Sequence, residues 1–298
     1  MNITLLNRIL AQPWAVRRAT LSLFTQLVMG QETPALRVPR AQKHAGQWWA
    51  AAEDASGMRQ ALAIPPSYVP MNHDAAMACA NGAVPDLAPG VVCIMAWGIL
   101  GRAWSALEKW WLNAVEVDEL SAAIAATPPG SKVVLWFRSP GGIITGIPET
   151  AAQLRALGAQ REIIGFTDDL CASAAYWLAA QCSSIVATPT ADVGSIGVYL
   201  AFYDFCAMLE KAGVKLELFK AGTMKGTGMM GKPLTEEERA YLQQGVLESY
   251  AAFTADVTMN RAVADEFMQG QTLRGDRAKA ANLVDRFTAS AADFFASL

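Results

Sequence analysis

Histidine is the scarcest chemically versatile residue of this chain. Only two are present among 298 residues, His44 and His73, and both precede the region whose pattern predicts an α/β domain. A Ser–His–Asp or Cys–His catalytic site, or a zinc site built on histidine, would need one of them to fold back onto that domain. Any hydrolase in the α/β region is therefore expected to use Lys, Asp or Glu as its base.

Cysteine is also sparse, and its spacing is uninformative. The five cysteines are odd in number and form no C-x-x-C pair: Cys79, Cys93, Cys171, Cys182 and Cys206. This excludes a disulfide framework or a structural zinc site as the expected organisation, and it suits a reducing compartment. We expect no metal and no cofactor. Cys171 has no histidine near it in the sequence and is interpreted as a small core residue.

Long apolar runs and blocks of like charge are absent too. No stretch approaches the roughly 18 apolar residues of a membrane span. The best N-terminal candidate, residues 19–29, is short, contains Thr, Ser and Gln, and is followed by no small-residue cleavage site. We therefore expect a cytoplasmic protein without a stable membrane anchor. The net charge of −3 argues against nucleic acid as a partner.

The composition of residues 1–85 differs from that of the rest. They hold both histidines, several Trp and Arg residues and a Pro-Pro-Ser break at residues 65–67, without strand–helix alternation. We interpret them as an N-terminal arm of helices and loops that ends near the turn cluster at residues 85–90. The predicted domains are thus the arm, residues 1–85, and an α/β domain, residues 86–298.

Apolar β-type runs alternate with helical patterns from residue 90 onward. The runs lie at residues 91–95, 133–137, 163–166, 184–187 and 214–219. Continuous apolar runs suit strands that are covered on both faces. Helices are expected at residues 148–157 and 204–212, and from a capping box at Thr235 and Glu238 along a stripe to Val257. The pattern predicts an α/β fold with a largely parallel sheet flanked by helices.

Four elements of this region could carry chemistry. The first is the Ser-Pro-Gly-Gly turn at residues 139–142, where glycines let backbone N–H groups face a ligand. The second is Ser173, at the start of a helix of small residues. The third is the Gly-bracketed turn around Ser195, and the fourth is Lys225 within a Gly/Thr loop. Three of them have an ordinary alternative when taken alone: a strand-ending turn at residues 139–142, a helix cap at Ser173, and a solvated surface lysine at Lys225.

Taken together, in their order and spacing, the four elements resemble the signal peptide peptidase A family of serine peptidases, which have the ClpP/crotonase fold. The resemblance runs from about residue 90 to residue 290. It includes a closing segment, Gln-Thr-Leu-Arg-Gly-Asp-Arg-Ala at residues 271–278, which continues to Asn-Leu-Val-Asp at residues 282–285. It implies an α/β peptidase that needs no cofactor and assembles into a homo-oligomer.

The resemblance implies a Ser–Lys dyad. Ser173 would attack the peptide carbonyl, Lys225 would accept its proton as general base, and Ser195 would orient the lysine amine. Free lysine has a pKa of about 10.4, so a lysine base near neutral pH must be destabilised as a cation, which burial under a bound peptide can do. A carboxylate beside the amine would oppose this, and Asp192 is the residue to inspect.

The resemblance also implies an oxyanion hole. The backbone N–H groups of Gly142 and Ala174 would stabilise the developing negative charge, and Gly141 would shape the turn. Each such donor is typically worth about a hundredfold or more in rate.

The layout, with an N-terminal arm of about 85 residues in place of a membrane anchor, resembles the capsid assembly (prohead) proteases of tailed phages. This implies scaffold, portal or capsid proteins as substrates, in the bacterial host cytoplasm or inside the immature shell. Three alternatives stay open. They are a bacterial signal-peptide-peptidase-like protease that degrades peptides, a crotonase-type acyl-CoA enzyme, and a non-catalytic capsid assembly protein on the same fold.

Overall fold

The computed structural model describes residues 67–298, with residues 81, 82, 106, 107, 110 and 111 left out, and the backbone of four short strands before them. These strands are β1 (Trp14–Val16), β2 (Gln42–His44), β3 (Gln47–Glu53) and β4 (Arg59–Ala63). Strands β2, β3 and β4 pair antiparallel. Most of the predicted N-terminal arm lies outside the described residues. What is described of it contains strands where the sequence favoured helices and loops.

The centre of the fold is a six-stranded sheet in which every neighbouring pair is parallel. In spatial order its strands are β16 (Arg286–Phe287), β13 (Ser184–Ala187), β11 (Ile163–Thr167), β9 (Lys132–Arg138), β6 (Val91–Trp97) and β5 (Tyr68–Pro70). The predicted strands at 91–95, 133–137, 163–166 and 184–187 are confirmed. The sheet also takes in β5 from before the expected domain boundary, which itself stays a prediction.

Both faces of this sheet are covered, which explains why its strands are apolar throughout. Along β9, Leu135 and Phe137 belong to one hydrophobic core, whereas Val134 and Trp136 belong to a second. The first core contains α5 (Val117–Ala125), α6 (Ile147–Gly158) and α7 (Ala174–Ala179). The second contains α3 (His73–Ala80) and α11 (Ala291–Ala296). The expected α/β architecture, with helices on both faces, is therefore confirmed.

Short strands continue from the carboxyl ends of the long ones and form two smaller sheets. One has the order β1, β10 (Gly141–Ile143), β7 (Leu100–Gly101), β8 (Val115–Glu116). The other has the order β12 (Leu170–Ala172), β14 (Asp192–Gly194), β15 (Thr272–Leu273). The chain passes from β9 to β10, from β11 to β12 and from β13 to β14. Of the residues predicted to be functional, all but Lys225 lie on these short strands or within two residues after them.

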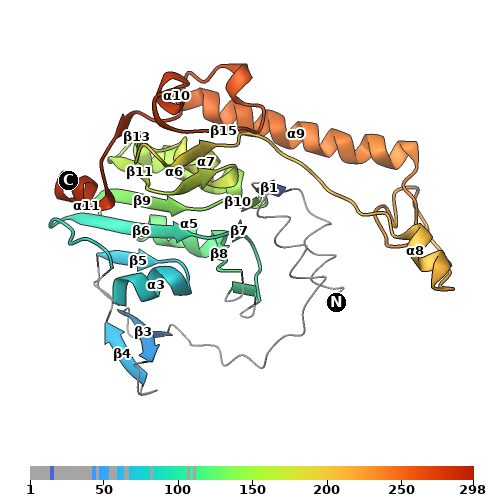
Figure 1. Cartoon of the computed structure of the whole chain (residues 1–298), viewed down its shortest axis with the longest axis horizontal. Helices are drawn as coiled ribbons and strands as arrows, with labels where there is room; N and C mark the ends of the chain where they lie inside the picture. Colours follow the sequence, from blue (N-terminus) through green and yellow to red (C-terminus); the bar gives the residue numbers. More distant parts are fainter. Residues whose placement is uncertain are drawn as a thin grey trace.

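After β14 the chain leaves the body of the molecule and returns through α9 (Glu236–Asn260), the longest helix described (Figure 1). Residues 201–235, called here the protruding segment, include α8 (Cys206–Lys211) at the far end of α9 (Figure 1). The chain closes with η1 (Asp265–Phe267), α10 (Gly275–Ala280), β16 and α11. No helix in the described part of the chain is both long and apolar enough to cross a membrane.

The strand predicted at residues 214–219 is wrong as a structural element. The segment has the alternating pattern of a strand, but the structure assigns it no regular structure, and most of its residues are exposed. A strand requires a neighbouring strand for its hydrogen bonds, and the described residues place none beside it. The capping box at Thr235 and Glu238 is confirmed, with both reciprocal hydrogen bonds present.

Candidate active site

Ser173 stands between β12 and α7 in a strained backbone conformation. Its φ is 55° and its ψ is −122°, and it is 1 % exposed. Its N–H donates to Gly194 O at 2.7 Å, and its carbonyl accepts from Trp177 N–H at 2.8 Å. The side chain caps no N–H of α7, so the helix-cap alternative does not explain this serine. A non-glycine residue held at positive φ is costly, and such residues gather at functional sites.

Ser195 lies beside Ser173 because their strands are in register. Ala172 of β12 pairs with Gly194 of β14, so the two serines follow directly after a paired position. Ser195 has the same φ of 55° and is 8 % exposed. Its N–H donates to Gln271 O at 2.7 Å, which ties the turn to the segment before β15.

The glycine turn of the predicted oxyanion hole lies against the helix that follows Ser173. Gly142 of β10 pairs with Leu100 of β7 so closely that a Cβ on Gly142 would lie 1.8 Å from the Leu100 carbonyl oxygen. Gly141 has a φ of 94°, a conformation that favours glycine. Strand β10 packs against α7, whose first residue, Ala174, is fully buried.

A short ladder fixes the glycine turn relative to Ser173. Ser139 N–H donates to Leu170 O at 2.7 Å, and Ala172 N–H donates to Ser139 O at 3.1 Å. The Ser139 hydroxyl donates to Gly98 O at 2.6 Å. The end of β9 is thus bound to β12, one residue before Ser173. The structure brings Ser173, Ser195 and the glycine turn into one buried group.

Lys225 is not part of that group. It lies in a turn of the protruding segment, is exposed, and donates its backbone N–H to Gly222 O at 3.2 Å. The segment between α8 and α9 lies at the far end of α9, well away from α7 (Figure 1). The structure of this single chain therefore assembles the nucleophile and the oxyanion turn but does not bring Lys225 to them.

A buried carboxylate anchors the end of the protruding segment to α9. Glu238 is 2 % exposed and accepts from Lys232 Nζ at 2.6 and 2.5 Å, from Thr235 N–H at 3.0 Å and from Thr227 Oγ1 at 3.2 Å. The hydrogen bonds from Lys232 and from the backbone of Thr235 lower the pKa of Glu238 to about 2. The turn that carries Lys225 is therefore held in a defined shape.

Two other side chains that the sequence raised take structural roles. The Asp192 carboxylate accepts from Arg274 Nε at 2.7 Å and Nη2 at 2.6 Å, a bidentate pair between β14 and α10. Burial raises the pKa of Cys171 well above its ordinary value, so its thiol stays protonated and suits the predicted core position. In the described residues no group of three or more His, Cys, Asp or Glu side chains could hold a metal ion.

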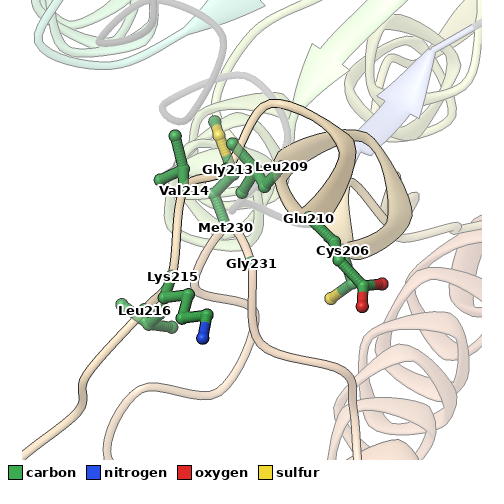
Figure 2. A pocket seen from close by; sticks show the side chains of 9 residues that line it. All are labelled: Cys206, Leu209, Glu210, Gly213, Val214, Lys215, Leu216, Met230 and Gly231. Carbon is green, nitrogen blue, oxygen red and sulfur yellow. The ribbon is translucent and has the colours of Figure 1, made fainter.

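The protruding segment contains a cavity that the sequence did not predict. Figure 2 shows its lining, and its volume is about 590 Å³. The lining is mainly apolar and comes from both sides of the segment: Cys206, Leu209, Glu210, Gly213, Val214, Lys215, Leu216, Met230 and Gly231. It lies at α8, apart from the buried group around Ser173 (Figure 1).

Comparison with known proteins connects this geometry with peptidases. Residues 155–293 match peptidase family S49, and this range contains Ser173, Ser195 and Lys225. The chain is 30% identical to "Probable protease SohB" of Haemophilus influenzae over 176 residues, which is 58% of this chain and 50% of that protein. It is 31% identical to "Probable protease SohB" of Buchnera aphidicola subsp. Schizaphis graminum over 189 residues, 61% of this chain and 55% of that protein.

The chain spans about half the length of the curated relatives it matches. Among solved structures, the ClpP protease catalytic domain from Plasmodium falciparum is similar at 13% identity with a TM-score of 0.37, covering 66% of this chain and 85% of that one. The family and protein matches support the resemblance to peptidase family S49 and a peptidase as the class of enzyme.

Proposed function

We propose that this chain is a serine endopeptidase in which Ser173 is the nucleophile and Lys225 the general base. The observation that carries the proposal is the position of Ser173. It is buried, strained and uncommitted to helix capping, and it lies beside the glycine turn and Ser195. The match of residues 155–293 to a peptidase family supports the same reading.

The proposed reaction has the following steps. The Ser173 hydroxyl attacks the peptide carbonyl and passes its proton to the neutral Lys225 amine, and the N–H groups of Gly142 and Ala174 stabilise the oxyanion. Collapse of the tetrahedral intermediate breaks the C–N bond, and the protonated lysine returns the proton to the leaving amine. A water molecule, deprotonated by the same lysine, then hydrolyses the acyl-enzyme. Ser195 would accept and donate hydrogen bonds that orient the amine.

The exposed position of Lys225 leads to a proposal about the assembled enzyme. The protruding segment carries Lys225 away from its own Ser173, and the segment presents several exposed apolar side chains. We propose that the active enzyme is a homo-oligomer in which Lys225 of one copy reaches Ser173 of another. Burial in that contact would supply the low-dielectric surroundings that a neutral lysine needs.

Mixing of variants tests the dyad and the exchange between copies together. Ser173→Ala and Lys225→Ala should each lower kcat by about a thousandfold or more, measured on a fluorogenic peptide that the wild type cleaves. A mixture of the two variants, dissociated and reassembled, should recover part of the activity. A mixture of Ser173→Ala with the double variant should recover none. If either single variant cleaves like wild type, the dyad is wrong.

The substrate proposal is more specific and needs its own test. The resemblance of the chain to the capsid assembly proteases of tailed phages favours cleavage of scaffold, portal or capsid proteins of a phage, in the host cytoplasm or within the immature shell. The similarity to SohB proteins favours a second candidate, a bacterial protease that degrades peptides. Incubation with a scaffold or portal protein, against unfolded casein and short peptides, separates them. Defined cuts in the scaffold or portal protein alone support the first, and degradation of casein and all peptides supports the second.

A further inference from the structure

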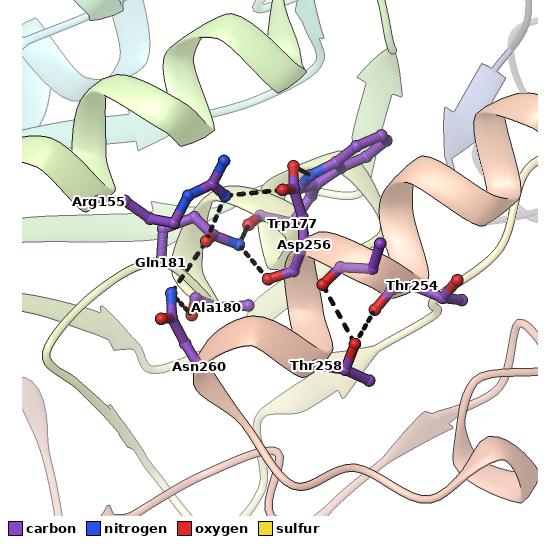
Figure 3. A network of polar contacts seen from close by, with 9 residues as sticks. Arg155, Trp177, Ala180, Gln181, Thr254, Asp256, Thr258 and Asn260 are labelled. Carbon is purple, nitrogen blue, oxygen red and sulfur yellow. Dashed lines mark hydrogen bonds and ion pairs between the residues drawn. The ribbon is translucent and has the colours of Figure 1, made fainter.

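A polar network inside the first core joins three helices at one point (Figure 3). Its centre is Asp256 of α9, which is 9 % exposed. One carboxylate oxygen accepts from Arg155 Nη1 of α6 at 2.8 Å, and the other accepts from the indole Nε1 of Trp177 of α7 at 2.7 Å. Each carboxylate oxygen thus accepts a hydrogen bond from a different helix, so Asp256 couples the positions of α6 and α7 to that of α9.

Gln181 closes the network just after α7. Its amide nitrogen donates to Trp177 O at 2.9 Å and to Asp256 O at 3.2 Å. Its amide oxygen accepts from Arg155 Nη1 at 2.7 Å and from Asn260 Nδ2 at 3.0 Å. The Trp177 ring also stacks on Phe253 of α9, with ring centroids 4.4 Å apart and planes 5° apart. The hydrogen bonds and the ring stacking therefore both hold α7 against α9.

Each of the three helices leads to one part of the proposed catalytic apparatus. Helix α7 begins directly after Ser173, and Trp177 N–H binds the Ser173 carbonyl. Helix α6 begins four residues after the glycine strand β10. Helix α9 follows the protruding segment that carries Lys225. Through its side chains the network joins the three helices that adjoin the proposed nucleophile, the glycine turn and the segment that carries Lys225.

Stability alone gives a weak reason for a charged group at this place. A buried ion pair is often replaceable by apolar residues at no cost in stability, because desolvation of the two charges offsets their attraction. What such a pair adds is direction, since a hydrogen bond is strong only within a narrow range of distances and angles. Trp177 is fully buried on a helix of otherwise apolar contacts, apart from the Tyr176 hydroxyl that binds Leu283 O.

We propose that Asp256 and Trp177 are positioning residues for catalysis, which act through α7 on the placement of Ser173. The inference rests on the proposed function, and it adds two residues that the Ser–Lys reading does not contain. Small misplacements of a nucleophile are costly, because about 1 Å can lower a rate by about a hundredfold.

Trp177→Phe is the sharpest test, because it keeps an aromatic ring at the position that stacks on Phe253 and removes the N–H donor to Asp256, together with part of the buried indole volume. We expect kcat to fall by about tenfold or more while KM stays within about twofold. Asp256→Ala should fall further, and Asp256→Asn should recover part of the loss because its amide oxygen still accepts from Trp177. The rate at which a fluorophosphonate phosphonylates Ser173, with loss of fluoride, should fall in parallel when it is followed by intact mass.

The matched control is Phe294→Leu, in the second core on the opposite face of the sheet. It should lower the melting temperature to a similar degree and leave kcat and the phosphonylation rate unchanged, well below the melting transition. If Trp177→Phe behaves like Phe294→Leu in both readouts, the network only stabilises the fold and the inference is wrong. Ser173→Ala, measured beside them, separates this outcome from failure of the proposed function, because only the latter leaves Ser173→Ala active.

Discussion

Residues 171–182 and residues 201–235 belong to the same chain but differ in almost every physical respect. Every residue of the first stretch is buried, and none of the second is. The first holds Ser173 against Ser195 and the glycine turn. The second holds Lys225 and presents exposed apolar side chains: Tyr203, Met208, Val214, Leu216, Phe219 and Met229. Folding of one chain therefore completes the surroundings of the proposed nucleophile and leaves those of the proposed base exposed.

The same difference divides α9. The predicted apolar stripe is buried at Phe253 and Val257, which pack in the first core, whereas Leu242 and Val246 near the other end are only partly covered. Contiguous exposed apolar surface on a folded chain marks a binding surface. The protruding segment thus carries apolar side chains of the kind that pack in a protein interior, but its own chain leaves them exposed. This supports a second copy of the chain as its partner.

Of the changes that test this contrast between the two regions, Gly142→Ala in the buried region should have the largest effect. Gly142→Ala would place a Cβ 1.8 Å from the Leu100 carbonyl oxygen, so β10 must move away from β7. We expect activity to fall by at least about a hundredfold, because an oxyanion donor moves with the strand. Gly245→Ala is the matched control: a Cβ there meets nothing within 4 Å, and activity should not change. Retained peptidase activity in Gly142→Ala would exclude its N–H from the oxyanion hole.

Negative charges placed on the apolar side chains of the protruding segment test its part in the proposed assembly. Leu216 and Phe219 are 42 % and 93 % exposed, so the double change Leu216→Glu/Phe219→Glu should leave the melting temperature of the single chain almost unchanged. We expect the assembly to dissociate in light scattering, and activity to fall by about tenfold or more, since Lys225 no longer meets a partner's Ser173. Lys215→Gln with Glu217→Gln is the control on the same segment. If Leu216→Glu/Phe219→Glu keeps the molecular mass and the activity of the wild-type assembly, the proposed assembly is contradicted.

A third prediction concerns pH and the anchor at Glu238. Because the pKa of Glu238 is lowered to about 2 in the folded protein, its contacts stabilise the fold fully above the ordinary carboxyl pKa of about 4.3 and weaken as pH falls from there toward 2. Over this range, the protection of residues 224–235 from hydrogen exchange, taken relative to the intrinsic exchange rate at each pH, should therefore fall in the wild type.

Glu238→Gln sharpens the same measurement. It should exchange faster already near neutral pH and show a smaller change on acidification, because the charge that holds Lys232 is gone. The matched control is Glu236→Gln, two residues earlier, where the side chain is 95 % exposed. This variant should follow the wild type. Equal exchange in all three proteins would mean that Glu238 does not hold the turn that carries Lys225.

How far the sequence alone predicts this molecule depends on whether its determinants are local. Strands β6, β9, β11 and β13 are predictable because burial on both faces leaves continuous apolar runs. The start of α9 is predictable from its capping box. Strands β5 and β16 are not, since they are only two or three residues long and owe their state to a neighbour. Residues 214–219 show the reverse case, a strand pattern without a neighbouring strand in the described chain.

The site divides in the same way. The residue types and spacing of Ser173, Ser195 and Gly142 can be read from the sequence, but serine does not require a positive φ, so the strain at both serines could not be predicted. The pairing of Trp177 with Asp256 spans 79 residues and has no local signal at either end. The position of Lys225 far from Ser173 depends on the path of the whole protruding segment, which no spacing between motifs encodes.

The smallest expected effect is at Thr235, and its location is more informative than its size. Thr235 Oγ1 accepts from Glu238 N–H at 3.2 Å, and loss of such a cap costs about 1 kcal/mol. Because no residue between Arg239 and Ala252 is buried, Thr235→Ala should fray only the first turns of α9 and leave the global melting temperature nearly unchanged. Thr235→Ser, which keeps the hydroxyl, should exchange like wild type. If instead Thr235→Ala lowers global stability by the full cost of the cap, the two halves of α9 unfold together, and the contrast between the buried and protruding regions would not extend to their energetics.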